Sequence, residues 1–240
     1  MAINPSVEKA LSTKRLDAYR QHSSTEAEAW ALYRWNIEVS AAVLPMAADL
    51  EVTLRNTIHD LMAARFGRED WWASPTLLLD DVTNEMLTEV VRKYRKKLAR
   101  GTVGPGRVVA DTMLGLWVHL LSRGGHSALG RSVNYEARLW RPTLRFGFST
   151  GTNSPAGQER RPPRAEVHRR ALMFQRLRNR AVHHEPLFKG IIIPGSNTLI
   201  PLDEVWERSI ELLGWMCPDL AALHRESGDF AAVLARRPAP

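Results

Sequence analysis

The chain has 240 residues, of which 44% are apolar and 25% charged, and its net charge is +7 with a pI near 10.0. This composition is that of a globular protein and excludes wholesale disorder. The single cysteine, Cys217, excludes an internal disulfide framework and a multi-cysteine zinc site, and it fits a reducing compartment. The excess of basic residues favours a polyanionic partner, although it also serves solubility.

The N-terminus and the apolar segments predict a cytoplasmic protein. The first residues lack the basic and apolar regions of a signal peptide. The most apolar stretch, 108–121, is interrupted by Asp111 and His119 and is too short to cross a bilayer. We therefore expect no membrane partner.

The predicted elements are almost all helical. Thr25 and Glu28 form a capping box that predicts a helix start. An apolar stripe follows at helical spacing to Leu44, where Pro45 predicts a kink or a split because it removes a donor and clashes with the preceding turn. A second stripe then continues until Gly67 offers a C-terminal stop.

Further helices follow along the chain. One is predicted from residues 80–83 to 100, and one over 108–121, which is apolar nearly all round and therefore central. A third, over 134–146, contains Pro142, which predicts a break. Segment 148–163 is rich in Gly, Ser, Pro and charge, and we expect a mobile linker there.

The remaining pattern completes an all-α fold, a helical bundle with additional helices. Pro186 predicts that the helix after the linker ends near His184. We expect one domain over residues 1–240, with N-terminal helices within 6–122, the linker at 148–163, a motif-bearing helix over 164–184, at most a small extended segment at 191–202, and C-terminal helices within 202–236.

The helix at 164–184 carries the densest chemistry. One face is an apolar stripe, comprising Val167, Ala171, Phe174, Leu177 and Ala181. The rest is mainly arginine, at positions 160, 161, 164, 169, 170, 176, 178 and 180, against Glu159 and Glu166 only. A solvated face normally mixes signs, so Arg169, Arg170 and Arg176 are predicted to contact an RNA backbone. The alternative is a basic surface that only keeps the protein soluble.

Histidines stand at the end of this helix. Metal-free RNA cleavage requires a base, an acid and a cation, and histidine and arginine supply these near neutral pH. Arg178 and His183 stand roughly 140° apart around the helix axis, so they converge only if the helix end unwinds or two copies face each other. Arg180 lies closer to His183 and is a rival phosphate binder. The alternative role for His183 and His184 is stabilisation of the helix dipole.

A family resemblance enters at these residues. Arg178-Asn179-x3-His183 matches the RX4–6H motif of HEPN-domain ribonucleases, and its context at 177–188 resembles the Abi-like (AbiD/AbiF type) abortive-infection proteins. Three earlier blocks resemble the same family in the same order: Arg15-Leu16-Asp17-x-Tyr19, Leu32-Tyr33-Arg34-Trp35-Asn36 and Leu50-Glu51-x-x-Leu54-Arg55-Asn56. The resemblance spans roughly residues 10 to 215.

The resemblance implies a HEPN-like helical bundle that dimerises through its motif helices. The two motifs would form one cleft for metal-independent endoribonuclease action without a cofactor, commonly as the toxin of a phage-defence or toxin–antitoxin system. Arg178 would bind phosphate, His183 would be the acid/base, and Asn179 would orient them. Arg178-x5-His184 matches the RX4–6H motif equally well. We favour His183, because His184 falls three residues after Ala181 on the buried stripe.

A second polar group, Glu51, Arg55 and His59, recurs every four residues on one helix face. The simpler interpretation is an exposed ion pair between Glu51 and Arg55. The functional one places both residues beside the motif helix, where they orient His183 or add charge. No metal-ligand spacing or nucleotide-binding loop is found in the sequence.

Two other function classes stay open. The chain could be a non-catalytic RNA-binding or interaction protein that keeps the HEPN-like fold, in which case RNA affinity depends on the arginines and not on His183. It could also be a toxin whose motif modifies a nucleotide or is itself modified by one.

Overall fold

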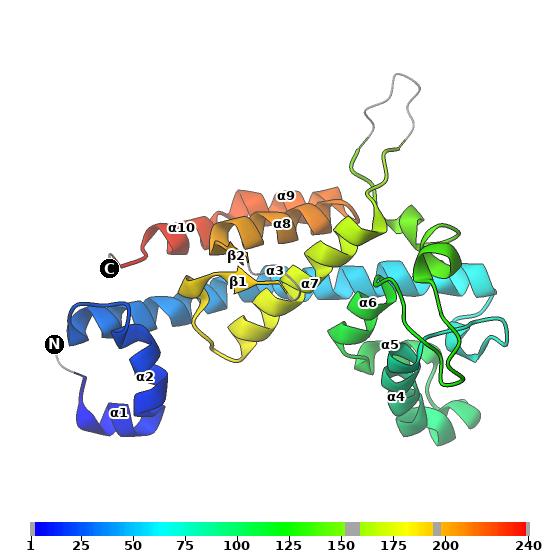
Figure 1. The fold of residues 1–240 in the computed structure, drawn as a ribbon, viewed down its shortest axis with the longest axis horizontal. Helices are drawn as coiled ribbons and strands as arrows, with labels where there is room; N and C mark the ends of the chain where they lie inside the picture. The colour runs from blue at the N-terminus through cyan, green and yellow to red at the C-terminus, as the bar shows by residue number, and fades with distance from the viewer. Residues whose placement is uncertain (1–2, 152–158, 194–197, 239–240) are drawn as a thin grey trace.

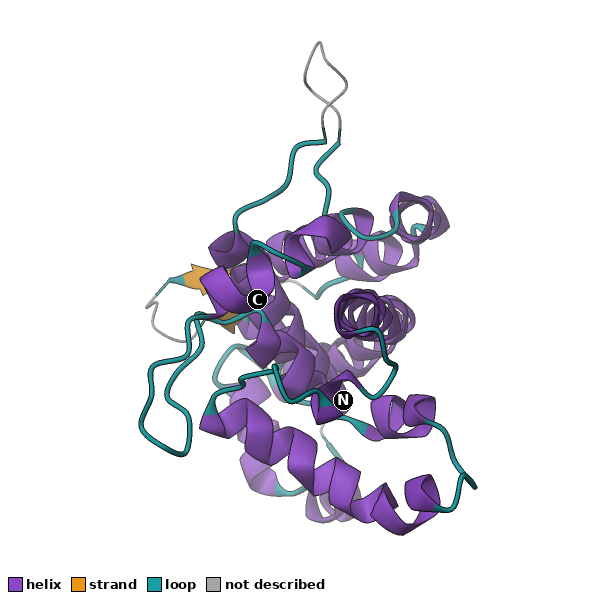
Figure 2. Ribbon diagram, turned by 90° about the vertical axis from the view of Figure 1, so that its right-hand side faces the viewer, coloured by secondary structure: helices purple, strands orange, loops and turns teal. Residues whose placement is uncertain are grey.

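The computed structural model describes residues 3–151, 159–193 and 198–238. Within them the chain forms ten α-helices and one two-stranded sheet, which confirms the all-α prediction (Figures 1 and 2). The helices are α1 (Pro5–Leu11), α2 (Thr13–Arg20), α3 (Glu26–Phe66), α4 (Asp81–Ala99), α5 (Pro105–Asp111), α6 (Leu114–Leu120), α7 (Arg164–Val182), α8 (Leu202–Gly214), α9 (Pro218–Ser227) and α10 (Asp229–Ala235). Short 3-10 or π turns are η1 (Trp71–Ala73), η2 (Glu136–Trp140), η3 (Leu144–Gly147) and η4 (Leu187–Lys189).

Helix α3 is the long spine on which α2, α6, α7, α8 and α10 pack (Figure 1). Its capping box at Thr25 and its stop at Gly67, in the left-handed conformation, confirm the predicted ends. The predicted split at Pro45 is wrong, because the helix is continuous over 41 residues. Pro45 and Ala41, whose carbonyl loses its donor, are both exposed, so water can satisfy that group. The neighbouring Met46 and Ala47 are buried and hold the helix together.

The apolar stretch at 108–121 is two short helices rather than the predicted single one. Helices α5 and α6 are separated at Thr112, which has an extended backbone. The Thr112 hydroxyl donates to the Val109 carbonyl (2.7 Å) and accepts from Trp117 Nε1 (2.9 Å). These side-chain bonds replace helical ones and fix the corner, which periodicity alone does not reveal.

The C-terminal region also contains one more break than predicted. Gly228, at a φ of 65°, separates α9 from α10. A break in 134–146 is confirmed, since η2 ends at Trp140 and η3 begins at Leu144. The small extended segment is confirmed as an antiparallel hairpin of β1 (Ile191–Ile192) and β2 (Leu199–Ile200). Residues 194–197, between the two strands, lie outside the described residues.

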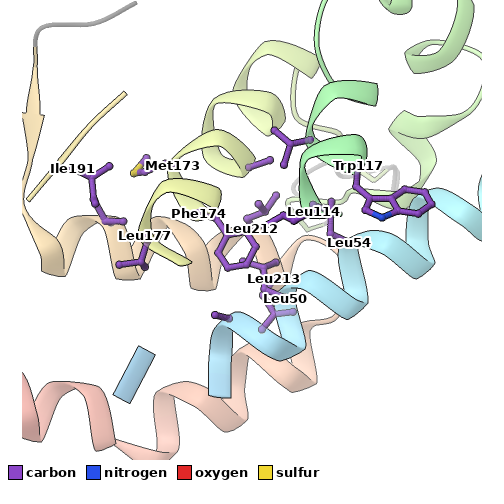
Figure 3. Packing of buried hydrophobic residues seen from close by; sticks show 14 of the residues in the cluster. Leu50, Leu54, Leu114, Trp117, Met173, Phe174, Leu177, Ile191, Leu212 and Leu213 are labelled. Carbon is purple, nitrogen blue, oxygen red and sulfur yellow. The ribbon is translucent and has the colours of Figure 1, made fainter. Parts of the chain in front are cut away.

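Helix α7 lies between α3, α6 and α8 and positions the motif. Its predicted apolar stripe is buried throughout. Phe174 lies beside Leu50 of α3 and Leu213 of α8 in the core, and Leu177 belongs to the same buried cluster (Figure 3). Burying one such side chain contributes about 1.5–3 kcal/mol, so this contact fixes the axis of α7.

The expected linker at 148–163 is described only at its two ends. Thr150 N–H donates to the Arg160 carbonyl (2.8 Å), and Arg160 N–H donates to the Gly151 carbonyl (3.0 Å), so these ends are paired. Residues 152–158 lie outside the described part. Across the described ranges, every helix is too short or too polar to traverse a lipid bilayer.

Candidate nucleic-acid site at the end of helix α7

Helix α7 ends in a hydrogen-bonded turn. His183 is the C-cap, and the N–H groups of His184 and Glu185 donate to the carbonyls of Ala181 (3.1 Å) and Arg180 (2.8 Å). This pattern is a Schellman motif, with His184 at the left-handed position (φ of 54°) that favours glycine. The helix therefore ends within two residues of the predicted end.

The turn changes one reason for preferring His183 over His184. Because the helix stops at Val182, His184 leaves the buried stripe and is exposed, so the prediction that His184 lies on this stripe is wrong. His183 is also exposed, and its ring makes no hydrogen bond to any residue that the structure describes. Both imidazoles are therefore accessible, and His183 alone continues the helical surface of Asn179.

Residues from the N-terminal half hold this turn. Arg15 Nη1 donates to the His184 carbonyl (2.9 Å). Asn36, fully buried, donates through Nδ2 to the Glu185 carbonyl (3.2 Å), and its Oδ1 accepts from Leu187 N–H (2.7 Å). The backbone after the motif is thus fixed from α2 and α3. Sequence reasoning assigned no role to Arg15 and Asn36, although both stand in the blocks that carry the family resemblance.

Arg178 contacts the second polar group. Its Nε donates to Glu51 Oε2 (3.1 Å) and its Nη1 donates to Asn179 Oδ1 (3.2 Å). The Arg178 side chain is 34% exposed and that of Glu51 22%. The functional interpretation of Glu51 is confirmed in its location, beside the motif helix. Its partner, however, is Arg178 rather than His183.

The other members of that polar group differ in what they contact. Arg55 lies one turn after Glu51, and its Nε is buried with no hydrogen-bond partner among the described residues. His59 instead accepts a hydrogen bond from Trp71 Nε1 (3.1 Å), in the core. Arg55 therefore brings an unengaged charge close to the Glu51–Arg178 pair, whereas His59 belongs to the packing of η1.

Arg180 is turned into the protein. Its guanidinium donates to the carbonyls of Pro186 and Gly190, and it pairs with Glu185 (3.4 Å). Burial lowers the pKa of this guanidinium, and the charges of Glu185 and Tyr19 oppose that shift. These contacts fix the segment after the motif. They weigh against Arg180 as a rival phosphate binder.

The predicted RNA-binding arginines fall into two groups. Arg169 and Arg170 both bind Glu166, and Arg170 also binds Glu211 and lies 4.6 Å from the Trp215 ring. Arg176 is exposed and makes no ion pair with any residue in the described ranges. A ridge open to solvent therefore consists of Arg176, Asn179 and His183, which share one side of α7 at spacings of three and four.

Exposed apolar side chains lie on the two helices that carry the Glu51–Arg178 pair. Leu44 and Val52 of α3 are 40% and 42% exposed, and Val182 of α7 is 42% exposed. Leu44 lies two turns from Glu51 on the same helix face, and Val182 lies one turn from Arg178. The ion pair of Glu51 with Arg178 is thus bordered by apolar surface on both helices.

Comparison with known proteins gives no relative. No protein-family model, no curated protein and no solved structure matches the chain. In the described ranges, no three His, Cys, Asp or Glu side chains are grouped so that they could hold a metal ion.

Proposed function

We propose that the chain is an Abi-like, HEPN-type endoribonuclease that cleaves RNA without a metal at the end of α7. One observation carries the proposal. Polar residues from all three N-terminal blocks, namely Arg15, Asn36 and Glu51, reach residues 178–187 from two other helices. A chance RX4H pattern on a solvated helix has no reason to attract such partners. The arrangement supports a functional motif, because residues of other helices orient both its backbone and its arginine.

The chemistry follows from the residues present. In the proposed step, one His183 imidazole takes the proton from a ribose 2′-OH, and the 2′-oxygen attacks the adjacent phosphorus. The bond from phosphorus to the 5′-oxygen breaks, and a second imidazole protonates that oxygen. The products are a 2′,3′-cyclic phosphate and a 5′-hydroxyl. Arg178 would stabilise the charge on the phosphate by exchanging Glu51 for a phosphate oxygen, with Asn179 orienting the guanidinium.

Two copies of the chain complete this site in our proposal. Arg178 and His183 point to sides of the helix roughly 140° apart, and the helix does not unwind before His183. A twofold axis near the motif would bring the second copy's imidazole to the same phosphate. The exposed Leu44, Val52 and Val182 supply apolar surface for such a contact.

The biological role rests on the family resemblance alone. We propose a cytoplasmic toxin of a phage-defence or toxin–antitoxin system, with RNA as substrate, a homodimer as the active form and an antitoxin as a further partner. No cofactor is required by the proposed step.

The test is cleavage of a labelled single-stranded RNA in EDTA. Wild type should cleave it, and His183→Ala and Arg178→Ala should each lower the rate by about 100-fold or more, which is the usual contribution of acid–base and charge stabilisation. The matched controls are His126→Ala and Arg100→Ala, which remove exposed side chains far along the chain from the motif. Equal rates in all five proteins would remove the proposed site.

A second candidate function is RNA binding without cleavage. It is favoured by the ion pair that already occupies Arg178, since Glu51 competes with phosphate for the guanidinium. In that case wild type retains RNA in EDTA and in Mg²⁺ without producing fragments, and His183→Ala binds RNA as tightly as wild type.

A further inference from the structure

Two further cations outside the motif, Lys189 and Arg237, make no ion pair within the described residues. A groove between α2, η4 and α10 contains His22, Lys189 and Arg237, with Trp35 and Phe188 in its wall. It comprises two adjoining hollows of roughly 620 and 730 Å³ that share His22 and Arg237. In Figure 1, α2, α10 and the hairpin all lie along the N-terminal half of α3. We call this feature the terminal groove.

We infer that the terminal groove binds backbone phosphates of the single-stranded RNA that extends from the motif. This inference rests on the proposed function, because it names a substrate contact outside the cleavage site.

Aromatic rings hold Lys189, Arg237 and His22 in place. Arg237 Cζ lies 5.7 Å from the centre of the Trp35 ring, and Lys189 Nζ lies 5.8 Å from that of Phe188. The His22 ring meets Phe188 edge-on at 5.0 Å. Trp35 and Phe188 are only 3% and 7% exposed, so they cannot move away. Cation–π contact of this kind orients a charge without neutralising it.

Neither Lys189 nor Arg237 makes an ion pair within the described part of the chain. The His22 ring meets the Ala18 carbonyl (Nδ1 to O, 3.2 Å). Nearby Arg20, in contrast, binds Glu8, Asp17 and Glu26. Among the described residues that line the groove, Asp203 is the one carboxylate. A concave surface whose charges are fixed but unpaired favours an anionic ligand.

We identify the ligand as the phosphate backbone of RNA, rather than its bases, because of what the aromatic rings contact. Arg237 and Lys189 already lie over Trp35 and Phe188, so the rings offer little face for a base to stack on. Phosphate contacts fix a strand without reading its sequence, and they need only charge and position. The strand is single because in-line attack by a 2′-OH requires a nucleotide free to leave duplex geometry, and such strands are the usual targets on RNA.

The terminal groove is rigidly joined to the motif. Lys189 follows His183 by six residues, and Arg180 binds the carbonyls of Pro186 and Gly190 on either side of η4. Phe188 also packs on Tyr19 of α2, with ring centres 5.4 Å apart. A strand cleaved beside His183 therefore has a fixed cationic surface next to it.

The experiment measures binding of a fluorescein-labelled single-stranded RNA to the full chain in the His183→Ala background, which prevents cleavage. Lys189→Glu and Arg237→Glu should each weaken binding about tenfold at low salt. Each should also reduce the slope of log K against log salt by about 0.7, the value for one lost phosphate contact on a single strand. The matched control is Lys97→Glu, an exposed and unpaired cation on α4, which should change binding less than twofold.

Each outcome decides the inference. Equal loss in the Lys97→Glu control, or unchanged binding in both groove variants while all proteins keep the wild-type melting temperature, overturns it. Competition by inorganic phosphate as strong as that by unlabelled RNA also overturns it, because the groove would then be a small-anion site.

A trinucleotide that spans only the motif separates this inference from the proposed function. Both groove variants, made with His183 intact, should cleave it at the wild-type rate, whereas failure of wild type to cleave it removes the proposed function and leaves the binding result standing.

Discussion

The two halves of helix α7 carry three arginines each, but these arginines differ in what they contact. In the first half, Arg164 and Arg170 have side chains only 13% and 14% exposed, and acidic residues bind both of them. In the second half, Arg176 and His183 are exposed without a partner in the described residues, and Arg178 shares its charge with one glutamate. Formal charge is therefore a poor guide to the charge that a ligand meets.

The difference arises from what packs on each half. Glu136 and Glu211 come from η2 and α8, which pack beside the first half of the helix and neutralise its arginines. The turn after the second half is instead held by Arg15 and Asn36, which donate to the His184 and Glu185 carbonyls and leave the Arg176 and His183 side chains unbound within the described residues. The arginines of the first half therefore serve packing and ion pairs, whereas Arg176 and His183 face solvent.

The largest expected effect comes from loosening the second half. Asn36→Ala should lower the free energy of unfolding by about 2–3 kcal/mol, because the Glu185 carbonyl and the buried Leu187 N–H lose their partner. RNA cleavage should fall with it, since the turn after His183 is no longer fixed. Urea unfolding measures the first effect. Asn56→Ala, at an exposed position on the same helix, is the control and should cost less than about 0.5 kcal/mol.

A pH titration probes the first half. Burial, with the charges of Arg164 and His119, lowers the pKa of His168 from 6.5 to about 4. The unfolded chain then binds a proton more readily than the folded one, so stability is complete above pH 6.5 and declines as the pH falls towards 4. The loss should reach about 2–3 kcal/mol. His168→Gln should flatten the unfolding free energy over that window, and an unchanged pH profile would contradict the assignment.

A smaller effect of opposite sign is expected at the turn itself. His184→Gly should raise stability by about 0.5–1 kcal/mol, because glycine adopts the left-handed conformation without strain. RNA cleavage should be retained if His183 is the acid/base. His184→Ala keeps the strain and removes the imidazole, so it serves as the control in thermal unfolding. Loss of cleavage in both variants would move the acid/base to His184.

The smallest effect concerns Arg178, which is partly exposed and pairs with one glutamate. Glu51→Gln removes the negative charge that holds Arg178, and it should tighten RNA binding a few-fold, equivalent to about 1 kcal/mol or less. Fluorescence anisotropy at two salt concentrations measures the change, which should shrink at high salt. Weaker binding would show that Glu51 serves RNA recognition by orienting Arg178.

Local signals predicted most of the fold. The capping box at Thr25, the stop at Gly67 and the apolar stripe of α7 each act within one helix, and each is confirmed. The breaks at Thr112 and Gly228 and the continuity through Pro45 were not foreseen. They depend on side-chain hydrogen bonds, on backbone conformation and on which face of the helix meets water.

The candidate site was predictable in composition and only partly in geometry. Spacing placed Glu51 near the motif helix and set Arg178 and His183 apart on its surface. It could not show that Arg180 turns inward to the Pro186 carbonyl, or that Glu211 reaches Arg170. These contacts join residues distant in the chain, which a single sequence without a fold does not reveal.

Chemical modification of arginine tests the contrast between the halves most directly. Phenylglyoxal reacts with accessible guanidinium groups, and mass spectrometry assigns each modified residue. We predict fast modification of Arg176, slower modification of Arg178 and protection of both by bound RNA, with Arg164 and Arg170 unreactive whether RNA is present or absent. Uniform reactivity along α7, or protection of Arg164 and Arg170 by RNA with Arg176 unaffected, would contradict the account.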